Sequence, residues 1–164
     1  MALSYKEMYS PVGKLKLVAS PDLLVAVLWE HERRDRVKLD PPKPASRHPI
    51  LRETERQLKE YFLGKRSEFG LPLRISGSEF QIRVWRALRE IPFGQTKSYR
   101  ELAIAVRSHP RAVGFANSKN PLSIIVPCHR LVGSDGSLTG YAGGLRAKAD
   151  LLAFEARVAA ASPN

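Results

Sequence analysis

Cysteine is scarce in this chain of 164 residues, which has a single thiol at Cys128. One thiol cannot close an internal disulfide bond, and this is typical of proteins from a reducing compartment. It also excludes zinc and iron–sulfur sites built from several cysteines. The four histidines are scattered and lack the spacing of a metal-binding motif. We therefore expect no metal and no other cofactor.

Long apolar runs are also missing. No stretch approaches the roughly 18–20 apolar residues that a membrane-spanning helix needs. Residues 1–11 carry charged and polar side chains where a signal peptide has its apolar core. The sequence therefore predicts a cytoplasmic protein with no membrane partner.

Acidic residues are few relative to basic ones, 16 against 27, and the net charge is +11. Such a balance favours a polyanionic partner, because each cation near a phosphate releases a condensed counterion. The alternative is that the charge only aids solubility. The densest basic stretch is residues 81–119, with Arg83, Arg86, Arg89, Lys97, Arg100, Arg107, Arg111 and Lys119. We expect a basic patch there.

The first half has the pattern of a small α/β unit. Residues 14–19 alternate polar and apolar side chains, and residues 23–29 are continuously apolar, so both segments are expected to be strands. Residues 31–49 are polar and rich in proline, which predicts a loop. Residues 50–63 have a helical apolar face that ends before Gly64. A boundary is expected near residues 71–77, giving domains at 1–76 and 77–164.

The second half is expected to be mostly helical. Ser78 with Gln81, and Ser98 with Glu101, each form a capping-box pattern that opens a helix. Pro110 suits the first position of a third helix, where its missing N–H has no cost. Two helices joined by a short turn, with basic residues around them, are typical of a helix-turn-helix that binds DNA. A plain helical hairpin has the same pattern.

The segment before Cys128 is expected to be a strand, because residues 124–126 are all β-branched. A base or cation near a thiol raises its thiolate fraction, and His129 follows directly. Adjacent side chains of a strand point to opposite faces, so His129 can act on Cys128 only if the chain turns or a water links them. The alternative is that Cys128 is a small buried apolar residue.

Several motifs in order resemble those of the O6-alkylguanine-DNA alkyltransferases, also called methylated-DNA–protein-cysteine methyltransferases. The central one is Pro-Cys-His-Arg at 127–130. The others are Phe80-Gln81 with Val84-Trp85, Ile91-Pro92-Phe93-Gly94 with Ser98-Tyr99, Arg111-Ala112-Val113-Gly114, Asn120-Pro121, Gly140-Tyr141-Ala142-Gly143-Gly144, and Glu155. The resemblance covers residues 78–157 closely and the first half only in outline.

The resemblance implies a fold and a reaction. The fold would be α/β, with a ribonuclease-H-like sheet domain followed by a helical, winged-helix-like domain that binds DNA. The protein would move an alkyl group from the O6 atom of guanine in double-stranded DNA onto Cys128. The product is a thioether that hydrolysis does not reverse, so each molecule would act once, and we expect a monomer.

The resemblance also implies roles for individual residues. His129 would take the thiol proton through a water, and Glu155 would orient His129. Asn120 would brace the turn that carries the cysteine, and Tyr99 would donate a hydrogen bond or a proton to guanine. The pocket for the base would be completed by Leu131, Tyr141, Ala142 and Gly143.

DNA would be held by the third helix. The nucleotide must leave the duplex to be reached, and Arg111 would take its place in the stack. Ala112 and Tyr99 would also be DNA-binding residues, and the small residues Gly114 and Ala116 would allow close approach to the DNA backbone. Between Tyr99 and Arg111 the chain has eleven residues, slightly fewer than is typical of the family, which bears on the pose of this helix.

Three other functions fit parts of the pattern. A protein that recognises alkylguanine without repairing it would not need Cys128. A cysteine hydrolase would need an oxyanion hole and usually a histidine distant in sequence, and it would turn over. A transcriptional regulator would leave residues 127–130 without a purpose.

Overall fold

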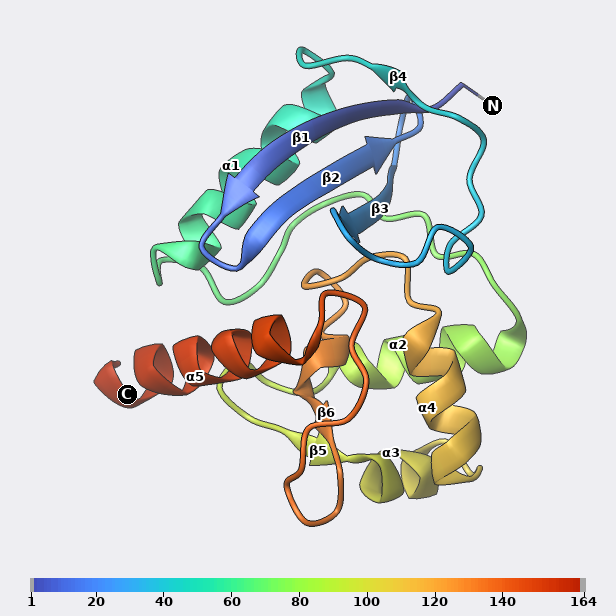
Figure 1. Cartoon of the computed structure of the whole chain (residues 1–164), viewed down its shortest axis with the longest axis vertical. Coiled ribbons are helices and arrows are strands. Elements are labelled where there is room, and N and C mark those ends of the chain that lie inside the picture. Colours follow the sequence, from blue (N-terminus) through green and yellow to red (C-terminus); the bar gives the residue numbers. More distant parts are fainter. Residues whose placement is uncertain (1, 163–164) are drawn as a thin grey trace.

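The computed structural model describes residues 2–162. Its N-terminal part is a four-stranded sheet with one helix against it, and its C-terminal part is mostly helical (Figure 1). The last described helix is long and lies below the N-terminal sheet in the view of Figure 1. No helix in the described part of the chain is long and apolar enough to cross a bilayer.

The sheet has the order β3-β2-β1-β4. Strands β1 (Ser4–Ser10), β2 (Gly13–Ala19) and β3 (Leu24–Trp29) pair antiparallel, and the last two are the strands that the sequence predicts. The expected loop at 31–49 needs a correction, because it contains the short strand β4 (Lys43–Pro44), parallel to β1. Pro44 has no N–H, so the bonds come from its neighbours: the N–H of Lys43 donates to the carbonyl of Leu3, just before β1, and that of Ala45 donates to the carbonyl of Tyr5.

Helix α1 (Pro49–Phe62) packs against β1 and β2. It begins at proline, whose fixed φ suits a first helical position. It ends before Gly64, whose φ of 74° is the left-handed conformation expected just past a helix. Its inner face carries Leu51, Leu58 and Tyr61, all fully buried.

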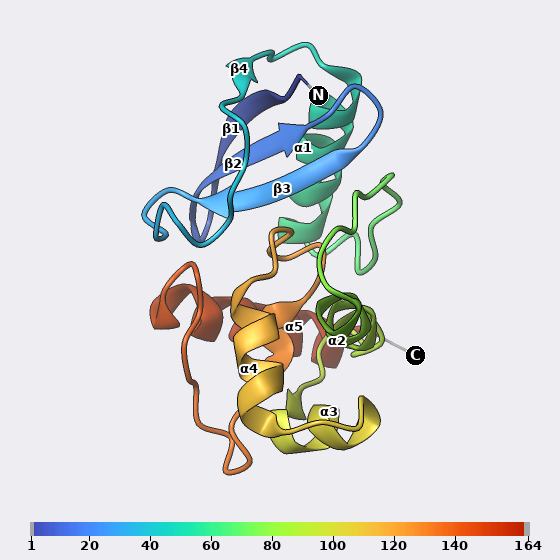
Figure 2. The ribbon, with the colours of Figure 1, turned by 90° about the vertical axis from the view of Figure 1, so that its right-hand side faces the viewer.

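The C-terminal part begins with three helices. They are α2 (Glu79–Arg89), α3 (Tyr99–Ala105) and α4 (Pro110–Ser118). Both predicted capping boxes are present, at Ser78 with Gln81 and at Ser98 with Glu101. Helix α4 packs on α2 and α3 (Figure 2). The helix-turn-helix pattern is thus realised in α3 and α4, with Arg107 in the turn at a φ of 58°.

The remaining elements surround the cysteine. Strands β5 (Lys97–Ser98) and β6 (Leu131–Val132) form a two-stranded parallel sheet. The 3₁₀ turn η1 (Cys128–Arg130) precedes β6, and α5 (Leu145–Ala161) closes the chain. The two parts of the chain are joined directly, because the N–H of Val27 in β3 donates to the carbonyl of Pro121 at 2.9 Å.

Candidate active site

The segment before Cys128 is a turn, and the expected strand at residues 124–126 is wrong. Ile124 has a φ of 72°, which no strand residue adopts. Buried Asn120 holds the turn, because its Nδ2 donates to the carbonyl of Val126 at 3.0 Å and its Oδ1 accepts from the N–H of Leu122 at 3.0 Å. The β-branched side chains therefore fill the core without forming a ladder.

Cys128 begins the 3₁₀ turn, so its side chain and that of His129 do not alternate as in a strand. The thiol is buried, and burial raises its pKa, while Asn120 beside it offsets part of the rise. The sulfur is therefore a protonated thiol at neutral pH. A reaction at this sulfur needs a base nearby.

The imidazole of His129 meets a carboxylate. Its Nε2 lies 2.8 Å from Oε2 of Glu155, and both side chains are fully buried. Burial raises the pKa of Glu155, but hydrogen bonds and charges from His129 and Arg130 outweigh this and lower it to about 2. Because the carboxylate is ionised, Nε2 must carry the proton and Nδ1 the lone pair. Burial lowers the pKa of His129, which favours this neutral form.

Arg130 completes the anchorage of Glu155. Its Nε donates to Oε1 at 2.8 Å and its Nη2 to Oε2 at 3.0 Å, while Nη1 donates to the carbonyl of Ile91 at 2.7 Å. Such a two-pronged pair fixes the carboxylate in orientation as well as in charge. Arg130 stands in the quoted motif, but nothing in the sequence assigned it this partner 25 residues away.

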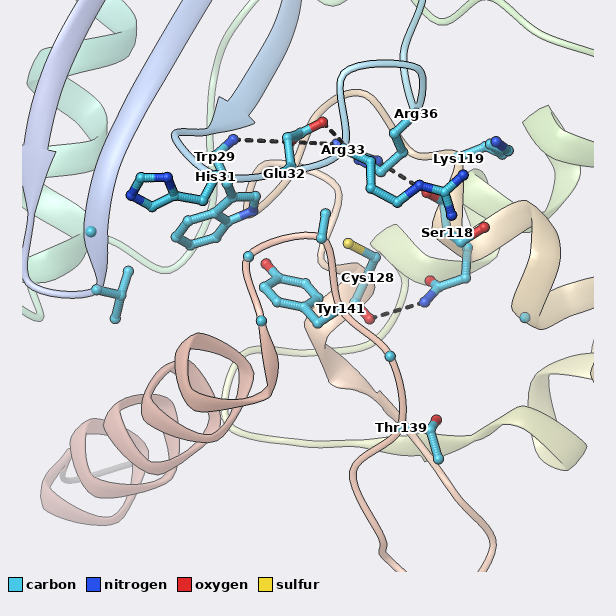
Figure 3. A pocket seen from close by; sticks show the side chains of 18 of the residues that line it. Trp29, His31, Glu32, Arg33, Arg36, Ser118, Lys119, Cys128, Thr139 and Tyr141 are labelled. Carbon is cyan, nitrogen blue, oxygen red and sulfur yellow. Dashed lines mark hydrogen bonds and ion pairs between the residues drawn. The ribbon is translucent and has the colours of Figure 1, made fainter.

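A pocket of about 920 Å³ opens at the cysteine (Figure 3). Seven of the predicted site residues line it: Tyr99, Arg111, Gly114, Cys128, Tyr141, Ala142 and Gly143. The N-terminal domain contributes Trp29 of β3 and Arg36 of the loop that follows this strand. The others lie elsewhere: His129, Glu155 and Asn120 are buried behind Cys128, Leu131 is fully buried in β6, and Ala112 lies half-buried on α4.

The loop of residues 133–144 is held to α3 and α5. The hydroxyl of Thr139 donates to the hydroxyl of Tyr99 at 3.0 Å, and Nζ of Lys148 donates to the carbonyl of Thr139 at 2.9 Å. Lys148 has no exposed surface, and its ammonium lies 5.8 Å from the centre of the Tyr99 ring. Burial lowers its pKa. Sequence reasoning missed Lys148, because only the tertiary structure brings it to this loop.

Helix α4 presents Arg111 to solvent at its first turn. Gly114 faces Tyr99, since a Cβ on it would lie 3.5 Å from that ring. The expectation for Ala116 is wrong: it is buried, and its carbonyl accepts from Nε1 of Trp85 at 2.9 Å, so it cannot face DNA. Arg36 holds the other end of the helix by donating to the carbonyls of Ser118 and Asn120.

Within residues 2–162, no three histidine, cysteine, aspartate or glutamate side chains are grouped so that they could hold a metal ion.

Two family models match the chain. The 6-O-methylguanine DNA methyltransferase, DNA binding domain matches residues 79–157, and the ribonuclease-like domain of the same proteins matches residues 3–75. The chain belongs to the 6-O-methylguanine DNA methyltransferase family. Proteins of this family repair DNA directly by moving an alkyl group from O6-alkylguanine to their own cysteine, so this chain is a DNA-binding methyltransferase of DNA repair.

Relatives named methylated-DNA–protein-cysteine methyltransferase support the assignment. That of Methanosarcina barkeri is 52% identical over 109 residues, which cover 65% of this chain and 68% of the relative. That of Methanosarcina acetivorans is 42% identical over 149 residues, covering 89% of this chain and 94% of the relative.

Solved structures agree with the fold of the whole chain. The crystal structure of Mycobacterium tuberculosis O6-methylguanine methyltransferase has a TM-score of 0.84 and 37% identity, and the match covers 98% of this chain and 96% of that one. The structure of Mycobacterium tuberculosis OGT in complex with DNA has a TM-score of 0.81 and 39% identity, covering 94% of each chain. The expected α/β fold, with a sheet domain and a helical DNA-binding domain, is confirmed.

Proposed function

We propose that Cys128 is the alkyl acceptor and that each molecule reacts once with O6-alkylguanine in duplex DNA. One observation carries this assignment. The single thiol of the chain lines the pocket, and the next residue is an imidazole held by a buried carboxylate. The thiol itself is a weak nucleophile because burial raises its pKa, so the histidine supplies the base.

The reaction balances as a displacement at the alkyl carbon. A water passes the thiol proton to Nδ1 of His129, and the sulfur forms a bond to the alkyl carbon. The bond between that carbon and O6 breaks, and its electron pair goes to guanine. Tyr99 donates a hydrogen bond or a proton to the guanine ring, which eases departure of the base. The product is S-alkylcysteine, a neutral thioether that water does not cleave.

Glu155 and Asn120 act behind the reacting atoms. Glu155 fixes the tautomer of His129 and stabilises the imidazolium that forms, which is the role of the third member of a catalytic triad. Asn120 holds the turn that delivers the cysteine, with one amide group bonded to both sides of it.

DNA is bound through helix α4. Arg111 fills the space of the nucleotide that has left the stack, and Ala112 and Gly114 allow the helix to approach the duplex closely. Flipping a nucleotide costs a few kcal/mol, and contacts of this kind offset that cost. The flipped base would lie among Tyr99, Tyr141, Ala142 and Gly143, with backbone groups of Cys128 and Leu131 reading its edge.

The proposal also covers the domain boundary, the oligomeric state and the cellular location. We place the domain boundary at residues 76 and 77, just before the N-cap Ser78 of α2. We expect a monomer in solution, since one chain contains every residue that the mechanism uses. The DNA substrate and the single free thiol support a cytoplasmic location.

Intact-protein mass spectrometry tests the reaction. The protein is mixed with an excess of a duplex that contains one O6-methylguanine, and the adduct is mapped by peptide sequencing. We expect the mass of one methyl group, on Cys128, and never more than one per molecule. Cys128→Ala serves as the control and should bind the same duplex without gaining mass.

Other outcomes would point to other functions. Tight binding to the duplex with no change in mass indicates a protein that recognises alkylguanine without repairing it. Continuous release of product with the thiol unmodified indicates a hydrolase. Either result overturns the proposal.

A further inference from the structure

Tyr61 reaches the active-site carboxylate from the N-terminal domain. It lies on α1, and its hydroxyl donates to Oε2 of Glu155 at 2.5 Å, across 94 residues of sequence. Oε2 is the same oxygen that meets Nε2 of His129 at 2.8 Å. Tyr61 has no exposed surface, and burial together with Glu155 raises the pKa of its hydroxyl. The hydroxyl therefore stays protonated and acts as a donor.

The ring of Tyr61 is fixed by other aromatic rings. Phe62 and Phe69 of the N-terminal half lie 5.0 and 5.6 Å from it between centroids, and Phe93 and Phe154 of the C-terminal half lie at 5.9 and 5.5 Å. Rings from both domains thus surround it. Such packing leaves little freedom for the hydroxyl, which is aimed at one carboxylate oxygen.

Four hydrogen bonds hold the carboxylate of Glu155. Oε1 accepts from Nε of Arg130, and Oε2 accepts from Nη2 of Arg130, from Nε2 of His129 and from the hydroxyl of Tyr61. Donors on both oxygens keep the carboxylate from turning away from His129. The N-terminal domain provides one of these four bonds.

We propose that Tyr61 is a positioning residue for alkyl transfer, which orients Glu155 and limits the pull of its Oε2 on the proton of His129. The proposal rests on the roles proposed above for His129 and Glu155. It also gives the N-terminal domain a part in the reaction. The domain supplies a hydrogen bond to the machinery that prepares the thiol.

The expected effect follows from the charge on Oε2. A hydroxyl that donates to this oxygen draws electron density from it, so the oxygen attracts the proton of an imidazolium less strongly. Tyr61 therefore helps to keep His129 neutral and able to accept a proton. The other charged or titratable groups facing the pair are Arg130 and Cys128 of η1, Tyr141 of the loop and Lys148 of α5. All of them remain in a Tyr61 variant.

Tyr61→Phe removes one oxygen atom and leaves the ring. We expect the acid limb of the single-turnover rate to move to higher pH by roughly half a unit to one unit. At pH values below the limb, the variant should react roughly threefold to tenfold more slowly than the unmodified protein, with unchanged affinity for the duplex. Thr54→Val is the matched control, because Thr54 is also fully buried on α1 and its hydroxyl bonds only to the carbonyl of Ile50. That variant should keep the normal profile.

A second variant keeps the test valid if Tyr61→Phe does not fold. Tyr61→3-fluorotyrosine retains the hydroxyl but makes it more acidic, and hence a stronger donor. The acid limb should then move the opposite way, to lower pH. A normal pH profile in both folded variants, or in the fluorinated one alone when the other does not fold, overturns the proposal. A lower melting temperature would then mean that Tyr61 only holds the domains together.

Two further samples in the same assay distinguish failure of the role proposed for Tyr61 from failure of the proposed function. If the unmodified protein does not alkylate Cys128, the proposed function fails. If it does, and Glu155→Gln changes the pH profile while the Tyr61 variants do not, only the role of Tyr61 is lost.

Discussion

A Cβ atom on Gly143 would lie 2.5 Å from the indole ring of Trp29. The loop that carries Tyr141 and Ala142 therefore fits against the N-terminal sheet only because residue 143 has no side chain. The same indole packs edge-on against Tyr141, with ring centres 5.6 Å apart. One wall of the pocket is thus shaped by a residue of strand β3.

Gly143→Ala tests this contact. The added methyl must push the indole or the loop aside, and overpacking of this kind costs roughly 1–3 kcal/mol of stability. We expect a lower melting temperature and slower alkyl transfer, measured by calorimetry and by single-turnover kinetics. Gly140→Ala is the control, because a Cβ at Gly140 has nothing within 4 Å.

Relief of the clash provides a stricter check. Trp29→Ala in the Gly143→Ala background removes the ring that the methyl meets. Trp29→Ala should then cost less stability in the Gly143→Ala background than it does in the unmodified protein. Additive losses would mean that the two residues are not coupled in solution.

The pH dependence of the unmodified protein follows from His129 and Cys128. Burial lowers the pKa of His129, so the rate should stay high below its usual value of 6.5 and fall only at more acidic pH. Burial raises the pKa of the thiol, so little thiolate forms without the base. We expect a flat rate from about pH 7 to about pH 9, in single-turnover assays. A rate that rises tenfold per pH unit over this range would show that the histidine is not the base.

Glu155→Gln should both slow the reaction and destabilise the protein. The substitution leaves Arg130 charged and buried without its partner, and breaking a buried pair in this way typically costs about 3–5 kcal/mol. Glu60→Gln is the control, since Glu60 pairs with Arg56 and Arg66 at the surface and should cost about 1 kcal/mol or less. Urea unfolding measures the free energy of unfolding of both variants. Equal losses of stability in the two variants would contradict the buried network.

Acid should lower the free energy of unfolding of the unmodified protein through the carboxylate of Glu155. The pKa of Glu155 is about 2 in the fold against an ordinary 4.5, so the unfolded chain binds a proton first as the pH falls. The stabilisation is complete above about pH 4.5 and is lost as the pH falls through about 2. Glu155→Gln should lack this part of the pH dependence of unfolding.

Local signals in the sequence predicted helices α1 to α4 well. The capping boxes at Ser78 and Ser98 act within three residues, and Pro110 acts at one position, so each can be found without the fold. The same holds for Gly64 after α1. The motif at residues 127–130 indicated the chemistry because its chemical groups are adjacent in the chain.

Contacts between distant segments could not be predicted from the residues alone, and the family resemblance implied only that of Glu155 with His129. Tyr61 lies in a helix whose pattern shows only that it is a helix, and Lys148 lies in α5, which was not predicted. The partners of both side chains lie elsewhere in the chain. The turn at Ile124 was missed for a related reason. Its β-branched residues favour a strand, and the side chain of Asn120 outweighs that preference by bonding both ends of the turn.

Arg111→Ala separates flipping of the base from the chemistry. Arg111 is exposed at the start of α4, at the mouth of the pocket, whereas Cys128, His129 and Glu155 are buried behind it. Its loss should therefore slow repair of duplex DNA far more than reaction with a free O6-alkylguanine base, which needs no flipping. Arg52→Ala removes the same charge from an exposed site on α1 and corrects for the general attraction of DNA. Equal losses on duplex and free base would assign Arg111 to the pocket itself, and equal losses in both variants would leave it only a role in overall charge.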